Sequence, residues 1–354
     1  MHDVDANLDV RVVPMADGGE GTVDAFLTSG AFARQARVRG PLGDPIDARF
    51  AREADVAILE MSAASGLELV PVDRCDVLAA TTYGTGQLIA AALDDGAKRI
   101  VLGIGGSATN DGGAGALAAL GVRFLDAVGE AIEPTPARLI DVRSIDMSGL
   151  DPRLASVAFE IACDVDNPLL GPTGATAIYG AQKGATGAVA EQAERGLLAF
   201  ADAIARVRES DLRELPGAGA AGGLGFGLAS LAGARLRRGV DVVAEVRGLA
   251  GALHGAAYCV TGEGRIDVQT LHGKTVAGVA DLAQRAGVPV YALGGSIDPS
   301  VERALFARGV VCVPICAAPI SLERAMREAL ALVRAAAARI ARSRRVLLGP
   351  TGGI

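Results

Sequence analysis

Four glycine-rich turns in this chain lie close to carboxylates, hydroxyls or a lysine. They occupy residues 17–22, 103–113, 216–223 and 261–267. Three of the four follow an apolar, strand-like run, and all four precede or lie near a helix-like stretch. Glycine permits positive φ and close backbone approach, and N–H groups at a helix N-terminus attract anions. The turns therefore predict an α/β enzyme that handles a phosphorylated ligand.

Acidic side chains in and near these turns could bind Mg²⁺ or accept a proton. Mg²⁺ prefers one or two carboxylates together with phosphate oxygens and water. Asp17 and Glu20 precede a helix that begins at Thr22, so they are either such ligands or a cap and a dipole partner for that helix. Asp164 and Asp166 follow a strand-like run, where they could bind a metal, accept a proton or form a turn.

A further acidic pair, Glu263 and Asp267, brackets Arg265 after a strand-like run. Ligands of parallel α/β sheets bind outside the carboxyl ends of the strands, so this pair could meet a substrate or a metal. An ion pair with Arg265 is the structural alternative.

The segment 103–126 resembles a dinucleotide-binding fingerprint, because a Gly-x-Gly-x-x-Ala run begins at residue 103 and Asp126 ends the next strand-like run. Two features disfavour this interpretation. Glycines fall in the expected first helical turn, where each costs ~1 kcal/mol relative to alanine, and Asp111 would place a carboxylate beside the pyrophosphate. Ser107, Thr109 and Asn110 are better suited to donate hydrogen bonds to a small carboxylate or to phosphate oxygens.

Lysine occurs only three times, at Lys98, Lys183 and Lys274. The last two lie in glycine-rich motifs, and lysine offers phosphate a mobile point charge, so both are candidates for a role at the site. The run Gly273-Lys274-Thr275 resembles the end of a P-loop, but Val268 stands where the opening glycine should be. A P-loop nucleoside triphosphatase is therefore disfavoured, and a surface lysine at a helix start stays possible for Lys274.

Strand-like and helical stretches alternate along most of the chain. Strands are expected at 10–13, 57–61, 99–104, 122–125, 157–163, 257–261, 288–293 and 310–315, and helices at 85–94, 188–208, 276–286, 299–307 and 322–341. This alternation predicts βαβ units and a largely parallel sheet. Residues 123–175 and 209–225 differ in composition, so we expect a second α/β lobe, residues 38–220, inserted between the two ends of the chain.

The composition narrows the class of protein. The 354 residues carry a net charge of −7, and no basic face stands out, so nucleic acid is not an expected partner. Five dispersed cysteines without a Cys-x-x-Cys pair indicate a reducing compartment, and we expect a cytoplasmic protein. No apolar run of membrane-spanning length and no signal peptide are visible. The sequence does not decide between a monomer and a homodimer.

Taken in order, the motifs resemble those of the bacterial glycerate kinase family, of the type that includes the glycerate 2-kinases. The resemblance rests on residues 13–22, 81–86, 103–113, 162–169, 182–185, 217–227 and 261–267, together with Gly273-Lys274. It spans about residues 10–340. Several long motifs in one order are more specific than any single glycine signature.

The resemblance implies ATP- and Mg²⁺-dependent phosphorylation of D-glycerate, with 2-phosphoglycerate favoured over 3-phosphoglycerate. It also implies an α/β fold of two domains. One is flavodoxin-like with a mostly parallel sheet, at residues 1–37 and 221–345, and the other is restriction-endonuclease-like and inserted into the first, at residues 38–220. Residues 346–354 would form a tail.

This function assigns expected roles to the side chains in the turns. The candidate catalytic residues are Asp111, as acceptor of the substrate hydroxyl proton, with Lys183, Asp267 and Lys274. The candidate Mg²⁺ ligands are Asp17, Asp166 and Asp267. The residues expected to bind substrate or phosphate are Gly18, Gly19, Thr22, Gly105, Gly106, Ser107, Thr109, Asn110, Gly262, Gly264 and Arg265.

The chain departs from the family pattern at its start. Family members usually begin with a strand and an Asp-Ser-Phe-Lys loop followed by a helix, and this chain starts after that unit. We therefore expect the flavodoxin-like sheet to lack its first strand. Two alternatives to an active kinase stay open: a truncated homologue that binds ligand without turnover, and an NAD-dependent oxidoreductase that uses the 103–126 segment.

Overall fold

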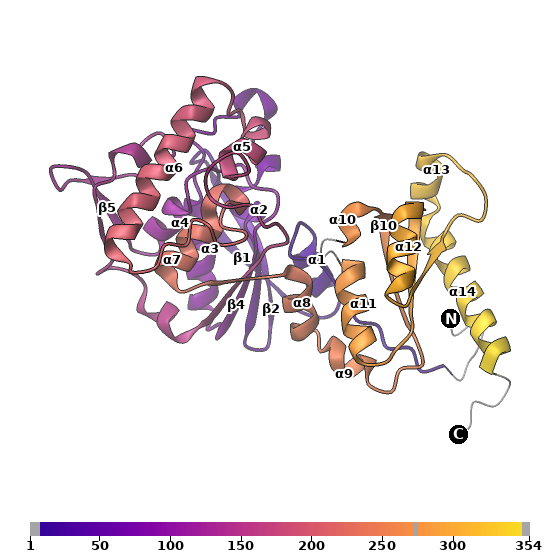
Figure 1. The fold of residues 1–354 in the computed structure, drawn as a ribbon. Coiled ribbons are helices and arrows are strands. Elements are labelled where there is room, and N and C mark those ends of the chain that lie inside the picture. Colours follow the sequence, from indigo (N-terminus) through magenta and orange to yellow (C-terminus); the bar gives the residue numbers. More distant parts are fainter. Residues whose placement is uncertain (1–7, 272–274, 349–354) are drawn as a thin grey trace. The chain divides into compact units, whose positions relative to one another are not determined.

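The computed structural model describes residues 8–271 and 275–348, which form an α/β protein (Figure 1). The chain divides into two compact units. We call Ala16–Val242 the central unit, and Met1–Met15 with Val243–Ile354 the terminal unit. Within the described ranges, no helix has the length and apolar content needed to cross a membrane.

The central unit is built on a six-stranded sheet in the order β1-β2-β3-β4-β8-β9. Its strands are β1 (Phe32–Arg39), β2 (Pro45–Glu53), β3 (Val56–Glu60), β4 (Arg99–Gly103), β8 (Ala158–Ala162) and β9 (Arg235–Arg237). The last four are parallel to one another, whereas β2 pairs antiparallel with both β1 and β3. Glu60 pairs with Gly103, Gly103 with Ala162, and Ala162 with Arg237, so four carboxyl ends lie at one edge of the sheet.

Helices cover this sheet. A second sheet, which is small and antiparallel, extends the unit. The helices are α1 (Thr22–Leu27), α2 (Ser62–Ser65), α3 (Tyr83–Asp94), α4 (Ala114–Ala119), α5 (Ala175–Tyr179), α6 (Ala188–Val207) and α7 (Leu224–Ala232). The small sheet has the order β6-β5-β7, with β5 (Arg123–Leu125), β6 (Ala131–Ile132) and β7 (Ser144–Asp146). Helix α8 (Gly239–Val246) begins in the central unit and ends in the terminal unit.

Strands β3 and β4 are buried on both faces, and this explains why their apolar runs are continuous. Leu59 and Leu102 are fully buried in the main core, and their neighbours Ile58 and Val101 are equally buried although they point to the opposite face. A strand covered on both faces has no exposed side, so its sequence does not alternate between apolar and polar residues. Helix α1 contacts β2 and β3 and covers part of the sheet.

The terminal unit is a three-layer structure around a parallel sheet in the order β10-β11-β12. Its strands are β10 (Cys259–Ile266), β11 (Val290–Ile297) and β12 (Val310–Pro314). Its helices are α9 (Leu249–Leu253), α10 (Val268–Leu271), α11 (Thr275–Arg285), α12 (Pro299–Ala307), α13 (Leu322–Arg327) and α14 (Ala329–Leu348). One apolar cluster joins the sheet to α9, α11 and α12, and another joins it to α14.

The expected α/β class with a mostly parallel sheet is confirmed, and most expected strands and helices are present. The strand expected at 10–13 is wrong. That segment has no ladder partner, and its Val12 side chain is 80% exposed. Strands β1 and β2 were not expected, because their alternating arginines and small residues lie on a half-exposed antiparallel edge and mimic a polar loop.

The compact units differ in their bounds from the domains expected at 38–220 and at 1–37 with 221–345. The central unit also contains residues 16–37 and 221–242. The reason is pairing and packing: β1 pairs with β2 over its whole length, and β9 pairs with β8. The composition of residues 123–175 and 209–225 suggests the bounds 38 and 220, but the pairing of β1 with β2 runs across residue 38.

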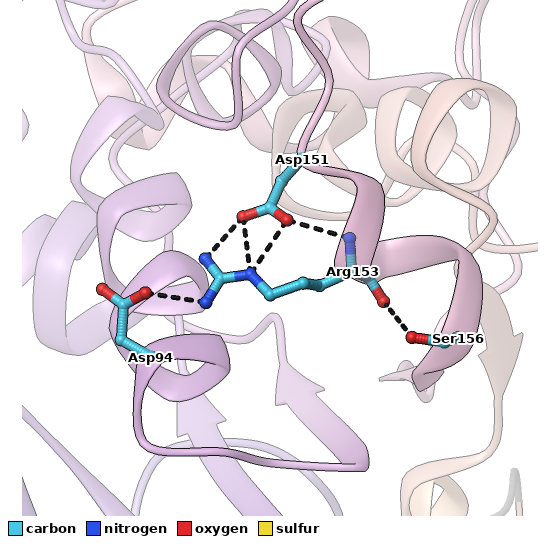
Figure 2. Close-up of polar contacts among 4 residues, drawn as sticks. All are labelled: Asp94, Asp151, Arg153 and Ser156. Atoms are coloured by element: carbon cyan, nitrogen blue, oxygen red, sulfur yellow. Dashed lines mark hydrogen bonds and ion pairs between the residues drawn. The ribbon is translucent and has the colours of Figure 1, made fainter.

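Arg153 fixes the connection that leads into β8 (Figure 2). Its guanidinium bonds to Asp151, two residues before it, and to Asp94 at the end of α3, with Nη1 2.8 Å from Asp94 Oδ1. The Ser156 hydroxyl donates to the Arg153 carbonyl oxygen at 2.9 Å. These contacts lie at the amino edge of the parallel strands, so they support the sheet at the edge opposite the carboxyl ends.

Glu60 ends β3 and holds the start of α1. Its Oε1 accepts a hydrogen bond from the Val23 N–H at 2.7 Å, and burial raises the pKa of this carboxyl above its ordinary value of 4.5. The folded state thus binds a proton more tightly than the unfolded chain, so the stability that Glu60 contributes is present below about pH 4.5 and is lost as the pH rises through the folded pKa.

We expect Glu60→Gln, which keeps the acceptor oxygen, to raise the melting temperature at pH 7.5 and to have little effect at pH 4. Thermal unfolding of both proteins at the two pH values checks this. A stabilisation of equal size at both pH values would contradict it.

Candidate active site

A cavity of about 830 Å³ lies at the carboxyl edge of the central sheet. Its walls come from the 17–20 turn, from the residues after β4 and β8, and from three further segments of the central unit. The lining residues are Asp17, Gly18, Gly19, Glu20, Leu67, Glu68, Val70, Pro71, Val72, Ile104, Gly105, Gly106, Ser107, Ala162, Cys163, Asp164, Val165, Tyr179, Gln182, Ala220 and Ala221. Two of the four glycine turns, far apart in the sequence, therefore form one site, and the end of a third contributes Ala220 and Ala221.

Glycine is required where the 17–22 turn lies on the strand ends. Gly18 has φ of +85°, and a Cβ on it would lie 2.4 Å from the Ala162 Cβ at the end of β8. A Cβ on Gly103, the last residue of β4, would lie 2.1 Å from the Gly18 carbonyl oxygen. A Cβ on Gly239 would lie 1.6 Å from the Asp17 carbonyl oxygen. Backbone thus lies directly against backbone at the floor of the cavity.

Carboxylates dominate the charge of the cavity wall. Asp17, Glu20, Glu68 and Asp164 line it, and its lining, as described, includes no lysine or arginine. Asp17 Oδ1 accepts from the Gly19 N–H at 3.1 Å, and Asp164 Oδ1 accepts from the Gly239 N–H at 2.9 Å. Burial, and then the charge of Asp17, raise the pKa of Asp164 to about 6.

These carboxylates fit a hard divalent cation. Repulsion between Asp17 and Asp164 would be relieved by a cation between them, and both present oxygen donors, which Mg²⁺ prefers. Among residues 8–271 and 275–348, no group of three or more His, Cys, Asp or Glu side chains could hold a metal. A metal here would therefore take part of its coordination from a phosphate or from water.

Ser107 and Lys183 form a buried polar pair at the cavity wall. Ser107 lines the cavity and is 8% exposed, whereas Lys183 is 2% exposed and lies behind it. The Lys183 ammonium donates to Ser107 Oγ and to the Thr109 carbonyl oxygen, both at 2.7 Å. Burial lowers the pKa of Lys183 to about 7, while the charge of Asp111 opposes that shift.

Asp111, expected as the proton acceptor, is fully buried and does not line the cavity. Its carboxylate accepts from the N–H groups of Thr82, Gly113 and Gly115 and from the hydroxyls of Thr81 and Thr82. Burial raises its pKa, and the bonds from Thr82, Gly113 and Gly115 oppose that shift. A carboxylate enclosed by five donors ties the 103–113 loop to the start of α3, so its geometry is that of a positioning residue.

Other expected ligand-binding residues lie behind the wall. Thr109 and Asn110 are fully buried, and Asn110 Nδ2 donates to the Thr176 hydroxyl at 3.1 Å. The Thr22 hydroxyl donates to the Gly19 carbonyl oxygen at 2.8 Å and so closes the 17–22 turn. Asp166 is exposed on the loop after β8 and is not part of the cavity lining. Gly18, Gly19, Gly105, Gly106 and Ser107 do line it.

A second cluster lies at the carboxyl end of β10 in the terminal unit. Asp267 Oδ1 accepts from the Gln269 N–H at 2.9 Å, and Asp267 Oδ2 lies 3.2 Å from Arg265 Nε. Glu263 accepts from the Val276 N–H at 3.0 Å and so holds the start of α11. A Cβ on Gly262 would lie 2.7 Å from the Leu293 carbonyl oxygen, whereas Gly264 faces open space. Lys274 lies outside the described residues.

The geometry does not favour the dinucleotide interpretation of residues 103–126. Helix α4 begins only at Ala114, after a loop whose Thr109, Asn110 and Asp111 side chains point into the protein interior. A dinucleotide fingerprint needs the helix to begin at the glycine turn, with its N-terminus at the pyrophosphate. Asp126 instead accepts from the N–H groups of Val128 and Glu130, in the turn of the β5–β6 hairpin.

Sequence reasoning missed the 67–72 wall of the cavity and Tyr179. The 67–72 segment is mostly apolar and carries no motif. It reaches the site because the Leu67 N–H donates to the Gly106 carbonyl oxygen at 2.8 Å and the Ala108 N–H donates to Ser65 at 3.0 Å. Backbone hydrogen bonds between distant segments leave no pattern in the local sequence. Ala221 also lines the cavity, and its backbone is left-handed, with φ of +52°. The surrounding glycines indicate a turn there but not this conformation of an alanine.

Comparison with known proteins points to a single family. The model of the family described as "Glycerate kinase family" matches residues 1–345. A glycerate kinase of Bacillus subtilis (strain 168) is 50% identical over 306 residues, which cover 85% of this chain and 80% of that protein. A glycerate 2-kinase of Escherichia coli (strain K12) is 46% identical over 293 residues, which cover 82% of this chain and 77% of that protein.

A solved structure agrees with these sequence matches. The crystal structure of "putative glycerate kinase 2 from Salmonella typhimurium LT2" superimposes with a TM-score of 0.87 at 43% sequence identity, covering 98% of this chain and 91% of that one. The match extends over both α/β units. The chain therefore belongs to the glycerate kinase family.

Proposed function

We propose that this protein is a glycerate kinase that transfers the γ-phosphoryl group of ATP to D-glycerate and yields 2-phosphoglycerate. Family membership supports the kinase reaction, and one relative bears the name glycerate 2-kinase. The observation that carries the proposal is the cavity at the carboxyl edge of the central sheet, where two glycine turns meet four carboxylates and a serine hydroxyl.

Phosphoryl transfer requires mainly positioning and charge neutralisation, and the cavity offers groups for both. The backbone of Gly105 and Gly106 and the Ser107 hydroxyl would bind anionic oxygens of the substrate or of the transferred group. Asp17 would help to hold Mg²⁺, which neutralises phosphate charge when bound. Asp164 lines the cavity beside Asp17 and would accept the proton of the substrate hydroxyl.

The terminal unit would contribute to nucleotide handling. Within this unit, we assign Arg265 and Lys274 to phosphate charge and Asp267 to Mg²⁺, as the family order of the motifs suggests. The ion pair between Arg265 and Asp267 is largely exposed on the arginine side, so it can be exchanged for a ligand at low cost. Asp166, exposed after β8, is the remaining candidate metal ligand.

A coupled assay of ADP release with ATP, Mg²⁺ and D-glycerate tests the function, and ³¹P NMR of the product separates 2-phosphoglycerate from 3-phosphoglycerate. We expect ADP release that depends on both substrates, and 2-phosphoglycerate as product. Absence of ADP release together with tight NADH binding would favour the oxidoreductase instead. Binding of glycerate or ATP without turnover would indicate a homologue that has lost catalysis.

Ser107→Ala is expected to lower kcat/KM by about 10²-fold, the usual effect of removing one donor from a site of developing charge. The control is Ser156→Ala, which removes an exposed hydroxyl bonded to the Arg153 carbonyl oxygen at the opposite edge of the sheet (Figure 2). It should leave kcat/KM within about twofold, as expected for a surface change. Equal kinetics for the two variants would remove Ser107 from the proposed site.

A further inference from the structure

Lys183 can influence the cavity through Ser107. The lysine is 2% exposed and is not part of the cavity lining, whereas the Ser107 hydroxyl lines it. Lys183 Nζ is 2.7 Å from Ser107 Oγ and 2.7 Å from the Thr109 carbonyl oxygen. The amine is thus held on the far side of the hydroxyl from any ligand in the cavity.

This arrangement sets the direction of the Ser107 hydrogen. A lysine ammonium can only donate, so Ser107 Oγ accepts from it and keeps its own hydrogen for another partner. On the cavity side, that partner would be a ligand atom. A hydroxyl that accepts from a cation is polarised and donates more strongly to an anionic oxygen, because bonds in such a chain reinforce one another.

The charges that face Lys183 come from two directions. On the protein side, Asp111 attracts its positive charge from the loop before α4. On the cavity side, the titratable groups come from four segments. They are Asp17 and Glu20 in the 17–20 turn, Glu68 in the 67–72 segment, Cys163 and Asp164 after β8, and Tyr179 in α5. Burial disfavours the ammonium and lowers the pKa of Lys183 to about 7, so the amine of the ligand-free protein would titrate near neutrality.

We propose that Lys183 is a positioning residue that takes up a proton when an anionic oxygen binds to Ser107. The anion is the carboxylate of the hydroxy acid or a phosphate of the nucleotide, and this choice rests on the proposed function. The proton comes from solvent, and no covalent bond forms or breaks. The ammonium then orients Ser107 as a donor, and the bound anion compensates the buried positive charge.

The sign of the pH dependence follows from this order. Below about pH 7 the amine is protonated with or without ligand, so binding takes up little proton. Above that pH the ligand-free amine is neutral, and each binding event must draw a proton from water. The KM for the anion should therefore rise with pH between about 7 and 9, by up to tenfold per pH unit, while kcat changes less.

The lysine count makes the proposal directly measurable. The chain contains only three lysines, so ¹³Cε-lysine NMR gives three resolvable titrations, with the Lys183 signal assigned from Lys183→Arg. Lys98, whose side chain is 77% exposed beside Asp55, is an internal control. Saturating D-glycerate, Mg²⁺-ATP and inorganic phosphate are added separately, so that a carboxylate source and a phosphate source are distinguished.

We expect at least one of the three ligands to raise the pKa of Lys183 by about one unit or more, with no change at Lys98. Ser107→Ala, saturated with the same ligand, should lose the shift. Lys183→Met, shown to be folded by its melting curve, should lose the rise of KM between pH 7 and 9.

Two outcomes would overturn the proposal: a Lys183 titration that none of the three ligands moves, or a full shift that persists in Ser107→Ala. The proposed function fails separately. A shift caused by phosphate or Mg²⁺-ATP in a protein that releases no ADP with D-glycerate would support the role of Lys183 and reject the glycerate kinase. Normal turnover with an unmoved Lys183 titration would support the glycerate kinase and reject the proposed role of Lys183.

Discussion

Asp111→Ala is expected to lower the free energy of unfolding by about 3–5 kcal/mol, the range found when a buried charge network loses one partner. The substitution strands the N–H groups of Thr82, Gly113 and Gly115, and each buried donor without an acceptor costs about 1–3 kcal/mol. Urea unfolding at pH 7.5 measures the loss. Activity should fall with the folded fraction, because the 103–113 loop loses its anchor to the start of α3.

Asp126→Ala is the matched control for this prediction. Asp126 also accepts two backbone N–H bonds, from Val128 and Glu130, but in an exposed hairpin turn where water replaces the lost acceptor. It should cost about 1 kcal/mol or less.

Asp111→Asn separates the positioning role from the role of a base. If Asp111 is a positioning residue, the substitution should lower the free energy of unfolding and kcat together. If Asp111→Asn unfolds like the wild type and yet has lost turnover, Asp111 is the proton acceptor that the sequence suggested, and its enclosed geometry is misleading.

Gly18→Ala is expected to abolish most of the kinase activity and to destabilise the central unit by several kcal/mol. Two effects add. The left-handed backbone, with φ of +85°, costs a non-glycine residue about 1–2 kcal/mol. The new methyl group would also lie 2.4 Å from the Ala162 Cβ, so the 17–22 turn must move off the end of β8. Such a shift displaces Asp17 from the cavity wall.

Gly21→Ala separates the two effects within the same turn. Gly21 has φ of +91°, but a Cβ on it meets nothing within 4 Å. We therefore expect only the backbone cost, about 1–2 kcal/mol, and nearly normal activity. Chemical unfolding and the ADP-release assay should rank Gly18→Ala far below Gly21→Ala. Similar losses for both variants would mean that backbone strain, and not contact with β8, explains the need for glycine.

Local patterns predicted much of the fold. The apolar runs of β3, β4, β8, β11 and β12 and the periodicity of α6 and α12 are properties of the segments themselves, and each appears close to its expected place. Strands β1 and β2 were missed because their exposed edge face carries charge. The compact units differ in their bounds from the expected domains, because pairing between β8 and β9 joins segments more than seventy residues apart.

Glycine spacing indicated where turns would lie, but not which of their side chains would face the cavity. Glycine spacing identified the 17–22 and 103–113 turns, and both contribute to the cavity wall. Which side chain of a turn faces the cavity depends on tertiary contacts: Ser107 faces it, while Thr109, two residues later, is buried behind it. Residue type alone cannot separate these two hydroxyls. The rarity of lysine makes Lys183 a candidate, but no sequence pattern indicates its position behind Ser107.

The backbone contacts of Gly18, Gly103 and Gly239 also constrain how this protein can evolve. A side chain at Gly103 would meet the carbonyl oxygen of Gly18, and one at Gly239 would meet that of Asp17, so three distant segments share one small space. None of the three positions can accept a larger residue unless the turn itself withdraws. Substitutions that diversify this enzyme are therefore expected to accumulate around the cavity, at 67–72 or at Tyr179, while these three glycines are inherited as a block.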